Sequence, residues 1–585
     1  MSRLLMSGNE AVARGAWEAG VKVGVGYPGT PSTEVLENLV KYEDVYCEWA
    51  PNEKVAAEVA VGVSVGGART LVTMKHVGLN VAADPLFTLA YIGVGGGYVL
   101  LVADDPGMHS SQNEQDSRNY AAFAKVPMLE PSNSQEALAF TRAAFGISEE
   151  FDIPVLVRTT TRVAHSKSLV ERGERDSQPL LPPYAPRVGK WVMMPGNARV
   201  RRVDLEQRTE RLRAFSNDCE FNRIEMRDPS LGIIVSGIAY EYVREALPEA
   251  SVLKVGMVNP LPEKLIVEFA SKVERLAVVE ELDPYMSLRL KALGLSLVET
   301  GLPVIGELSP DRIAQAFGAP VRETRDAITD LPPRPPLLCA GCPHRGVYWA
   351  LGKLKATVMG DIGCYTLGAL PPLSAMDSCV CMGASVGMAH GLGLAGTAER
   401  PVVGVIGDST FAHSGITGVL DMVYNGGTGT VVILDNRTTA MTGHQGNPVS
   451  GKTISGAEAP MLDLETLVKA LGVPWVRTVD PLDMHATLAV LTEATQTGAM
   501  SVVIAKSPCV LLVKRDDQQP FAIDEDLCTA CGACVRLGCP AIMKAASGHP
   551  IIDTASCVGC EQCVQVCRFE AIVSVGPACD FGGGL

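Results

Sequence analysis

The segment 401–445 constrains the fold of this chain more than any other stretch. Apolar, β-favouring runs at 402–406 and 430–434 flank a stretch with helical periodicity, so the sequence predicts a βαβ unit. Asp408 follows the first predicted strand and Asn436 follows the second. The carboxyl ends of parallel strands form the edge where α/β sheets bind ligands. Two oxygen ligands there, beside a glycine-containing turn, are suited to Mg²⁺ and bound phosphate groups.

The chain is long enough for several domains, since it has 585 residues and a hydrophobic content of 47%. No apolar run is long and uncharged enough to span a bilayer, and the N-terminus lacks a secretory pattern, so we expect a soluble, cytoplasmic protein. The net charge of −15 and the pI near 5.2 argue against nucleic acid as a partner.

Residues 1–170 are predicted to form a first domain with a doubly wound α/β sheet, because apolar runs that favour strands alternate there with helical segments. The expected strands are 21–27, 70–74, 98–103 and 154–158. After the first strand, a tight turn at 27–32 places Ser32 as a helix N-cap. Among the polar residues on the loops after the strands, His76 is the candidate functional residue.

A carboxylate opens the predicted helix 52–62. Glu53 in its first turn could simply interact with the helix dipole. The alternative is a buried acid, which holds its proton more tightly than a solvated one and can take part in proton transfer.

The rest of the chain divides into four regions. Residues 171–229 are charged and contain prolines, and are predicted to be a linker with an amphipathic helix at 205–215. Residues 230–330 show a separate α/β pattern and end before a proline-rich run at 331–336. We expect its strands at 232–236, 252–255 and 277–279 and a helix at 241–247. A second large α/β domain covers 337–515, and 516–585 is a small cysteine-rich domain.

Seventeen cysteines without an export signal indicate metal ligands, redox groups or core residues rather than a disulfide framework. Eight of them form two runs, Cys528-x2-Cys531-x2-Cys534-x4-Cys539 and Cys557-x2-Cys560-x2-Cys563-x3-Cys567. The pattern is typical of bacterial ferredoxins with two [4Fe–4S] clusters, in which the fourth cysteine of each run binds the other cluster. Structural zinc is the alternative, although zinc sites rarely repeat such triplets. The longer gap before Cys539 and Arg568 in place of a proline depart from the pattern.

The ferredoxin pattern implies two ligand sets: Cys528, Cys531, Cys534 and Cys567 for the first cluster, and Cys557, Cys560, Cys563 and Cys539 for the second. We expect the pairs Ile551/Ile552 and Ala571/Ile572 to supply the small core of this domain, which would be marginal without inorganic centres.

Further cysteines lie in the second large domain. The Cys-x2-Cys pair at 339 and 342 could by itself bind zinc, form a redox pair or occur by chance. Cys364 and Cys509 could be buried apolar thiols. We expect Cys379 and Cys381, in an apolar glycine-rich stretch, to belong to the core, and Cys47, Cys219 and Cys579 have no assigned role.

Several of these segments resemble the thiamine diphosphate-dependent 2-oxoacid:ferredoxin oxidoreductases. They are Tyr27-Pro-Gly-Thr-Pro-Ser32, the Asn-Glu motif at 52–62, Cys339-Ala-Gly-Cys-Pro-His-Arg345, Gly407-Asp-Ser409 and the tail Asn436-Arg-Thr-Thr-Ala-Met-Thr-Gly-His-Gln445. Ser409 replaces the last glycine of the family's Gly-Asp-Gly fingerprint. The resemblance covers essentially the whole chain, and the domain order is similar to that of the large (alpha) subunits of the indolepyruvate type. Residues 230–330 resemble the family's small transketolase C-terminal-like domain.

The resemblance implies roles for individual residues. Glu53 would bind the aminopyrimidine ring of thiamine diphosphate, and Thr30 would contact the substrate carboxylate. Asp408, Asn436 and Thr438 would hold Mg²⁺, and the cofactor-binding set also includes Gly407, Ser409 and Met441. His76 and His344 are further catalytic candidates. A third [4Fe–4S] cluster, near thiamine diphosphate, would be held by Cys339, Cys342, Cys364 and Cys509.

The activity that the resemblance implies is CoA-dependent oxidative decarboxylation of aryl 2-oxoacids to acyl-CoA and CO₂, with reduction of a soluble ferredoxin. The family's gamma-type domain is absent from this sequence, so a small beta subunit would carry it, in a dimer of alpha–beta heterodimers. Two alternatives stay open at this point. The substrate could be phenylpyruvate, pyruvate or 2-oxoglutarate, or the chain could be an electron-transfer subunit without catalysis, as the substitution at Ser409 would allow.

Overall fold

The computed structural model describes residues 3–176, 184–322, 329–331, 335–513, 518–545 and 548–575. The proline-rich run at 331–336 lies partly outside these ranges and Cys579 lies wholly outside them. The chain forms two compact units, Met1–Ala327 and Ile328–Leu585, which are described separately. In the described ranges, no helix has both the length and the apolar character needed to cross a bilayer.

Unit 1 is built on a seven-stranded sheet with strand order β12-β6-β7-β5-β4-β2-β3, parallel except for the edge strand β12. The strands are β2 (Val23–Gly26), β3 (Tyr46–Trp49), β4 (Thr70–Lys75), β5 (Tyr98–Asp104), β6 (Met128–Leu129), β7 (Val155–Thr160) and β12 (Met257–Asn259). Four of these are the predicted strands. β4, β5 and β7 are buried at every position, as expected for central parallel strands covered on both faces.

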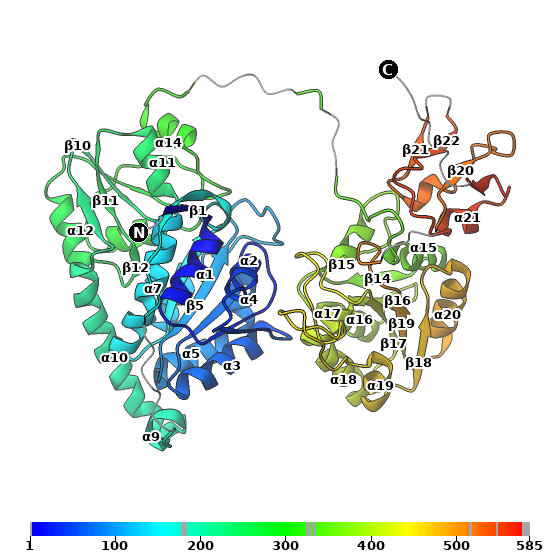
Figure 1. Ribbon diagram of the computed structural model, residues 1–585, viewed down its shortest axis with the longest axis horizontal. Helices are drawn as coiled ribbons and strands as arrows, with labels where there is room; N and C mark the ends of the chain where they lie inside the picture. Colours follow the sequence, from blue (N-terminus) through cyan, green and yellow to red (C-terminus); the bar gives the residue numbers. More distant parts are fainter. Residues whose placement is uncertain are drawn as a thin grey trace. The chain divides into compact units, whose positions relative to one another are not determined.

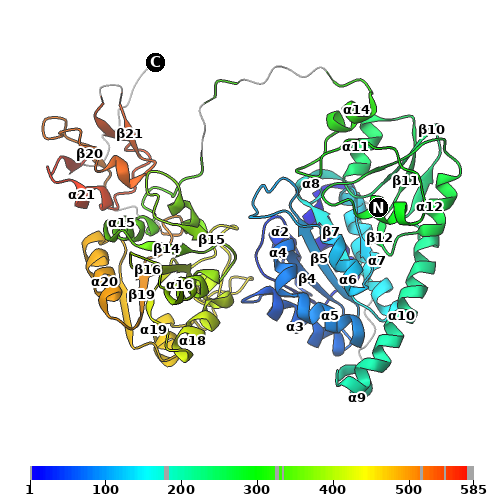
Figure 2. The ribbon, with the colours of Figure 1, turned by 180° about the vertical axis from the view of Figure 1, so that it is seen from behind.

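Helices follow the strands of this sheet in alternation, which confirms the predicted doubly wound fold. They are α1 (Gly8–Glu18), α2 (Thr33–Leu39), α3 (Glu53–Val65), α4 (His76–Val81), α5 (Ala83–Ile92), α6 (Arg118–Ala124), α7 (Ser134–Phe151) and α8 (Thr161–His165). One group packs α1 against α7, and another packs α3 against α5 (Figure 1 and Figure 2). A short antiparallel pair, β1 (Arg3–Ser7) with β8 (Lys167–Glu171), closes the domain. Ser32 precedes α2 as predicted, but its hydroxyl donates to the Gly29 carbonyl (2.8 Å) instead of capping the helix.

The region predicted as a linker is largely one helix, α10 (Pro195–Asp218), preceded by α9 (Val188–Trp191). It extends beyond the predicted 205–215 because its charged residues are good helix formers. Leu205, Arg208 and Leu212 are buried, and the helix packs against α5, α7 and α12 (Glu263–Ala270) (Figure 1). The segment is therefore part of the packed unit.

The third domain has a four-stranded sheet in the order β13-β10-β11-β9. Its strands are β9 (Arg223–Glu225), β10 (Asp228–Val235), β11 (Ala250–Lys254) and β13 (Leu276–Val279), with helices α11 (Ala239–Ala246), α12, α13 (Tyr285–Ala292) and α14 (Pro310–Phe317). The predicted boundary at 230 is too late, because β9 and β10 begin before it. The sequence also missed β12, which leaves this domain and pairs with β6 of the first sheet.

Unit 2 contains a parallel six-stranded sheet with the order β15-β14-β16-β17-β19-β18. Its strands are β14 (Thr357–Gly360), β15 (Ser378–Cys379), β16 (Val402–Gly407), β17 (Gly429–Asp435), β18 (Trp475–Val479) and β19 (Met500–Lys506). Its helices are α15 (His344–Leu354), α16 (Ala384–Ala395), α17 (Asp408–Thr410), α18 (Ile416–Tyr424), α19 (Leu464–Ala470) and α20 (Met484–Gln496), with a 3₁₀ turn η1 (Cys364–Ala369) and a π-helical turn η2 (Phe411–Gly415).

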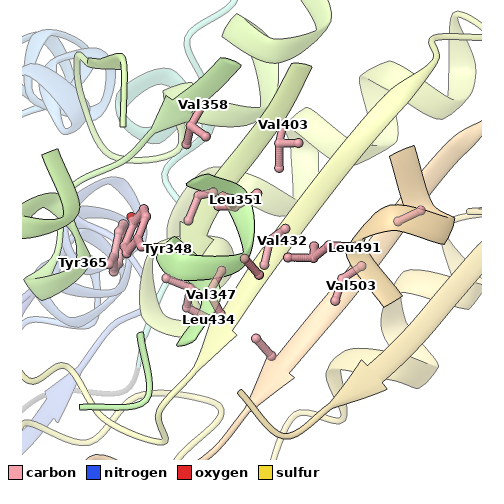
Figure 3. Close-up of a cluster of buried hydrophobic side chains, with 14 of the residues drawn as sticks. Val347, Tyr348, Leu351, Val358, Tyr365, Val403, Val432, Leu434, Leu491 and Val503 are labelled. Atoms are coloured by element: carbon pink, nitrogen blue, oxygen red, sulfur yellow. The ribbon is translucent and has the colours of Figure 1, made fainter. Parts of the chain in front are cut away.

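One core of unit 2 fixes helix α15 on this sheet (Figure 3). Val347, Tyr348 and Leu351 recur at helical spacing on α15 and pack on Val432 of β17 and Val503 of β19. Since α15 begins at His344, two residues after Cys342, this packing also fixes where the Cys339–Cys342 loop lies.

The C-terminal domain is small and has little regular structure: β20 (Phe521–Ile523), η3 (Val535–Leu537), β21 (Ile542–Lys544), β22 (Pro550–Ile552), α21 (Gln562–Val566) and β23 (Ile572–Ser574). Its buried core comprises Cys534, Ile542 and Ile572, and Ala571 is buried too. The prediction for Ile551 was wrong, because this side chain is 39% exposed on the outward face of β22. So small an apolar core is typical of domains that depend on bound metal.

Candidate functional site

The predicted strand-end site of unit 2 lies on two neighbouring parallel strands. Gly407 at the end of β16 pairs in register with Leu434 of β17, so the residues that follow, Asp408 and Asn436, emerge at one edge of the sheet. A Cβ atom on Gly407 would lie 2.6 Å from the Tyr365 ring, which explains why the turn needs glycine there. The π-helical turn η2 follows Asp408 closely, a distortion that is frequent at functional sites.

Asp408 is a buried carboxyl whose environment would favour a bound cation. Burial, together with the neighbouring Asp435 carboxylate, raises the pKa of Asp408 to about 8. Its Oδ1 accepts a hydrogen bond from the Ser409 N–H (2.6 Å), whereas the buried Oδ2 accepts none of ordinary geometry from the described residues. An unsatisfied buried carboxylate oxygen is costly, and a bound Mg²⁺ would remove that cost. The residues present therefore fit the expected metal.

The neighbouring segment supplies further oxygen atoms. Asn436 and Thr438 are buried, and the Asn436 Oδ1 accepts from the Thr438 N–H (3.3 Å). Ser409 is buried and its hydroxyl accepts a hydrogen bond from the Thr439 hydroxyl (2.9 Å). Its φ is not positive, so the turn does not require the glycine that Ser409 replaces. Met441 is 51% exposed on this unit.

The four cysteines at 339, 342, 364 and 509, here called the proximal group, lie together beside this edge. Burial raises the pKa of Cys342 to about 12 and that of Cys364 to about 11, and thiols of the same group add to both rises. The Cys509 N–H donates to the Asn436 carbonyl (3.0 Å), and the Asp408 carboxylate is close enough to raise the Cys509 pKa. The main chain of one cysteine of the group is thus hydrogen-bonded to the main chain of one candidate magnesium ligand.

The cysteines of the C-terminal domain line two cavities, each with the set that the ferredoxin pattern implies. The first cavity is lined by Cys528, Cys531, Cys534 and Cys567. The second cavity is lined by Cys557, Cys560, Cys563 and Cys539, so the extra residue before Cys539 does not remove its thiol from the group. Arg568, which replaces the usual proline, is exposed. Within the described ranges, no three His, Cys, Asp or Glu side chains converge as closely as a single bound metal ion requires.

The remaining described cysteines differ in exposure. Cys379 and Cys381 were predicted to be core residues, and this prediction was wrong: both are exposed, because β15 forms the edge of the sheet at the level of the strand ends. Cys47 and Cys219 are buried, and burial raises their thiol pKa values to about 12 and about 11. These two behave as small apolar core residues.

Unit 1 carries its own strand-end site at the carboxyl ends of β2, β3, β4 and β5. Glu53 is the first residue of α3 and is only 5% exposed, whereas Glu58 is exposed and forms an ion pair with Lys54. A Cβ atom on Gly78 would lie 2.5 Å from the Glu53 Oε1, so glycine in α4 leaves the space that this carboxylate occupies. Of the two readings of Glu53 that the sequence left open, the structure therefore shows a buried acid.

Thr30, Lys75 and His76 surround the same edge. Thr30 is half-buried. The turn at Gly29 packs on Lys75: a Cβ atom added to Gly29 would lie 3.1 Å from the Lys75 Cβ. The Lys75 Nζ donates to the Ser110 carbonyl (2.6 Å), and burial lowers the Lys75 pKa to about 8. His76 is fully buried with Nε2 at 3.2 Å from the Asn113 carbonyl. Sequence reasoning did not rank Lys75, because the burial of a lysine at the end of a strand has no sequence signal.

His344 and Arg345 are the first two residues of α15, and both side chains are buried. His344 is buried against the Tyr365 ring, with centroids 5.9 Å apart, and burial lowers its pKa to about 4. Arg345 is 2% exposed and donates to the carbonyls of Leu338, Cys339 and Leu537. The guanidinium therefore joins the main chain before and within the Cys339–Cys342 loop to the main chain of the C-terminal domain.

Three family models match this chain. The model for the thiamine diphosphate-binding domain of pyruvate flavodoxin/ferredoxin oxidoreductases matches residues 14–193. The model for the C-terminal thiamine pyrophosphate-binding domain of thiamine pyrophosphate enzymes matches residues 361–505. A 4Fe–4S binding domain matches residues 550–573. The matches cover the two strand-end sites and the second cysteine run, and they agree with the expected fold class and with thiamine diphosphate and 4Fe–4S clusters as cofactors.

Curated relatives match almost the whole chain. The indolepyruvate oxidoreductase subunit IorA of Methanothermobacter marburgensis is 43% identical over 98% of this chain and 98% of its own length. The protein of the same name from Archaeoglobus fulgidus is 40% identical over 97% of both chains, and that from Thermococcus kodakarensis is 39% identical over 97% of this chain and 96% of its own. The chain therefore belongs to the indolepyruvate oxidoreductase subunit IorA family, among the thiamine diphosphate-dependent 2-oxoacid:ferredoxin oxidoreductases.

Proposed function

We propose that this chain is the large subunit of a cytoplasmic enzyme that oxidatively decarboxylates aryl 2-oxoacids, of which indolepyruvate is one. The carboxylate leaves as CO₂, CoA accepts the acyl group, and electrons pass one at a time to a soluble ferredoxin. The proposal for the substrate rests on the name that relatives at 37–43% identity share. The reaction class rests in addition on the thiamine diphosphate and 4Fe–4S domains.

The diphosphate end of the cofactor is assigned to residues 337–515. We propose that Asp408, Asn436 and Thr438 hold Mg²⁺ and that Gly407, Ser409 and Met441 line the adjoining cofactor site. The orphaned Asp408 Oδ2 and the buried amide and hydroxyl beside it support this assignment. A metal there would neutralise the diphosphate charge and anchor it.

The pyrimidine end is assigned to residues 1–170. When bound, thiamine diphosphate supplies the electron sink for decarboxylation. We propose that Glu53 holds a proton against its aminopyrimidine ring, and that Thr30 binds the substrate carboxylate. The burial of Glu53 and the position of Thr30 after β2 support these roles. For His76 and His344 the catalytic role stays a prediction.

Electron acceptors are assigned to the three cysteine groups. We propose one [4Fe–4S] cluster on the proximal group and one in each cavity of the C-terminal domain, since four thiolates is the number that each cluster requires. The observation that carries the overall proposal is the main-chain hydrogen bond of 3.0 Å from Cys509 to Asn436, because it places the residue of a candidate cluster ligand beside that of a candidate magnesium ligand. This adjacency is expected if electrons released at thiamine diphosphate enter iron directly.

The complete enzyme is proposed to include a small beta subunit that carries the gamma-type domain, in a dimer of alpha–beta heterodimers. Membership of a family named as a subunit supports a partner chain.

Anaerobic purification of the alpha–beta complex, followed by iron, sulfide and thiamine analysis, tests the cofactor content. We expect about twelve iron atoms per alpha chain, whereas about eight would remove the proximal cluster. CoA-dependent reduction of ferredoxin is then compared for indolepyruvate, phenylpyruvate, pyruvate and 2-oxoglutarate. Faster reduction with pyruvate or 2-oxoglutarate would overturn the aryl preference, and absence of bound thiamine diphosphate would indicate a non-catalytic electron-transfer subunit.

A further inference from the structure

The loop between Cys339 and Cys342 forms part of the wall of the second cavity. Ala340 and Gly341 line this cavity together with its four cysteines. A Cβ atom on Gly341 would lie 2.3 Å from the Val558 Cγ2 and 3.6 Å from the Cys560 Cβ, and its φ is +73°. Glycine is therefore needed at this contact for both its space and its backbone conformation. For the first cavity, the lining comes entirely from residues 523–572.

Two buried polar side chains join the loop to the C-terminal domain at this contact. Arg345 donates to the Cys339 carbonyl (2.9 Å) and the Leu338 carbonyl (2.9 Å) on the loop side, and to the Leu537 carbonyl (2.6 Å) on the other. Gln562 of α21, in the C-terminal domain, donates to the Cys342 carbonyl of the loop (3.1 Å). Both residues are almost fully buried, at 2% and 1% exposure. Buried side chains bound to main chain hold two segments in one arrangement.

A second set of contacts keeps α21 in place. The Gln565 side chain accepts from the Met484 N–H (2.8 Å) and donates to the Leu482 carbonyl (2.9 Å), both at the start of α20. Helix α20 packs on α15, the helix that carries Arg345. The C-terminal domain is thus fixed to the sheet domain on both sides of the loop.

The charge of Arg345 also lies between the two thiol groups. Its guanidinium binds the Cys339 carbonyl (2.9 Å) in the proximal group and the Leu537 carbonyl (2.6 Å), two residues before Cys539 of the second cavity. A buried positive charge favours thiolate, and it equally favours the more negative, reduced state of a cluster held by those thiolates.

We propose that Arg345 and Gln562 are positioning residues for electron transfer: they hold the proximal group against the second cavity, which makes that cavity the entry point of the C-terminal domain. This inference rests on the proposed function for the source of the electrons. A cluster held by the proximal group would lose one electron, and a cluster held by the cysteines of the second cavity would gain it, with no proton or group transferred. The first cavity, whose lining includes no residue of the sheet domain, receives its electron after the second.

The test is an EPR redox titration of the anaerobic alpha–beta complex with dithionite, which needs neither 2-oxoacid nor CoA. Signals are first assigned to the two cavities with Cys528→Ser and Cys557→Ser. In Arg345→Met, we expect lower reduction potentials at the proximal group and the second cavity and an unchanged potential at the first cavity. We also expect loss of spin coupling between the proximal group and the second cavity. The matched control is Arg536→Met, because Arg536 is exposed and donates to the Cys531 carbonyl (3.1 Å) beside the first cavity. It should leave the proximal group and the second cavity unchanged.

Gln562→Leu keeps every charge and removes one loop contact, so it separates positioning from electrostatics. We expect weaker spin coupling with little change in potential, and at least a tenfold slower reduction of the second cavity in stopped-flow experiments. The proposal is overturned if Arg345→Met alters the first cavity rather than the second, or if both variants retain wild-type coupling. If Arg345→Met does not fold, the Gln562→Leu result decides. Failure to turn over any 2-oxoacid would count against the proposed function and would leave this measurement intact.

Discussion

The buried ion network beneath the strand-end site of unit 1 gives a prediction that can be worked through in energy. Arg158 of β7 is 1% exposed, and its Nε lies 2.7 Å from the Asp104 Oδ2, with Glu130 at hydrogen-bond distance and Asp116 at 3.9 Å. Asp104 ends β5 and accepts from the Ser117 N–H (3.0 Å), so the network also positions the loop after that strand. Arg158→Met keeps the volume of the side chain and removes its charge.

Removing one partner leaves carboxylates buried without compensation, which costs about 3–5 kcal/mol. Unit 1 spans residues 1–327, and at about 2.1 cal/mol/K of unfolding entropy per residue such a loss corresponds to a fall in Tm of roughly 4–7 °C. Arg213→Met is the matched control, since Arg213 forms an ion pair with Glu210 while 51% exposed, and exposed pairs contribute only about 0–1 kcal/mol. Differential scanning calorimetry of the full chain compares the two variants.

Adding Glu130→Gln to Arg158→Met should recover part of the lost stability, because it removes one of the unpaired charges. The reasoning is refuted if Arg158→Met costs no more than Arg213→Met. It is equally refuted if Glu130→Gln makes the Arg158→Met protein less stable still, because the carboxylate would then stabilise the fold without its partner.

Three further predictions concern single carboxylates. Glu53→Gln should lower kcat by about 10²–10⁴-fold while thiamine diphosphate content is unchanged, since proton transfer is lost and the shape is kept; a kcat within a few-fold of wild type would exclude the role. Asp408→Asn should lose Mg²⁺-dependent retention of thiamine diphosphate on gel filtration, and undiminished retention would contradict the metal assignment. Burial raises the pKa of Glu281 from 4.5 to about 7, so the folded chain binds this proton more tightly than the unfolded chain. Stability should therefore fall by about 3 kcal/mol as the pH rises between those values, and Glu281→Gln should abolish that fall in urea titrations at each pH.

Local sequence patterns determined much of this protein. Continuous apolar runs in the sequence located β4, β5, β7 and β16, because strands that are buried on both faces have apolar residues at nearly every position. The spacing of the C-terminal cysteines defined two ligand sets, and each set lines one cavity. Asp408 and Asn436 were predicted to share an edge because the carboxyl ends of adjacent parallel strands must do so.

Tertiary structure alone decided which side chains are buried and what they contact. Arg345 follows a Cys-x2-Cys pair in the sequence, yet in the fold it binds the main chain of Leu537, a residue 192 positions later. Cys379 and Cys381 lie in an apolar stretch, yet both are exposed, because β15 is an edge strand. The sequence does not reveal which strand forms the edge of a sheet. The pairing of β12 with β6 of another domain likewise could not be read from the sequence. Contacts between distant segments are set by the packing of whole elements, and no local periodicity carries that information.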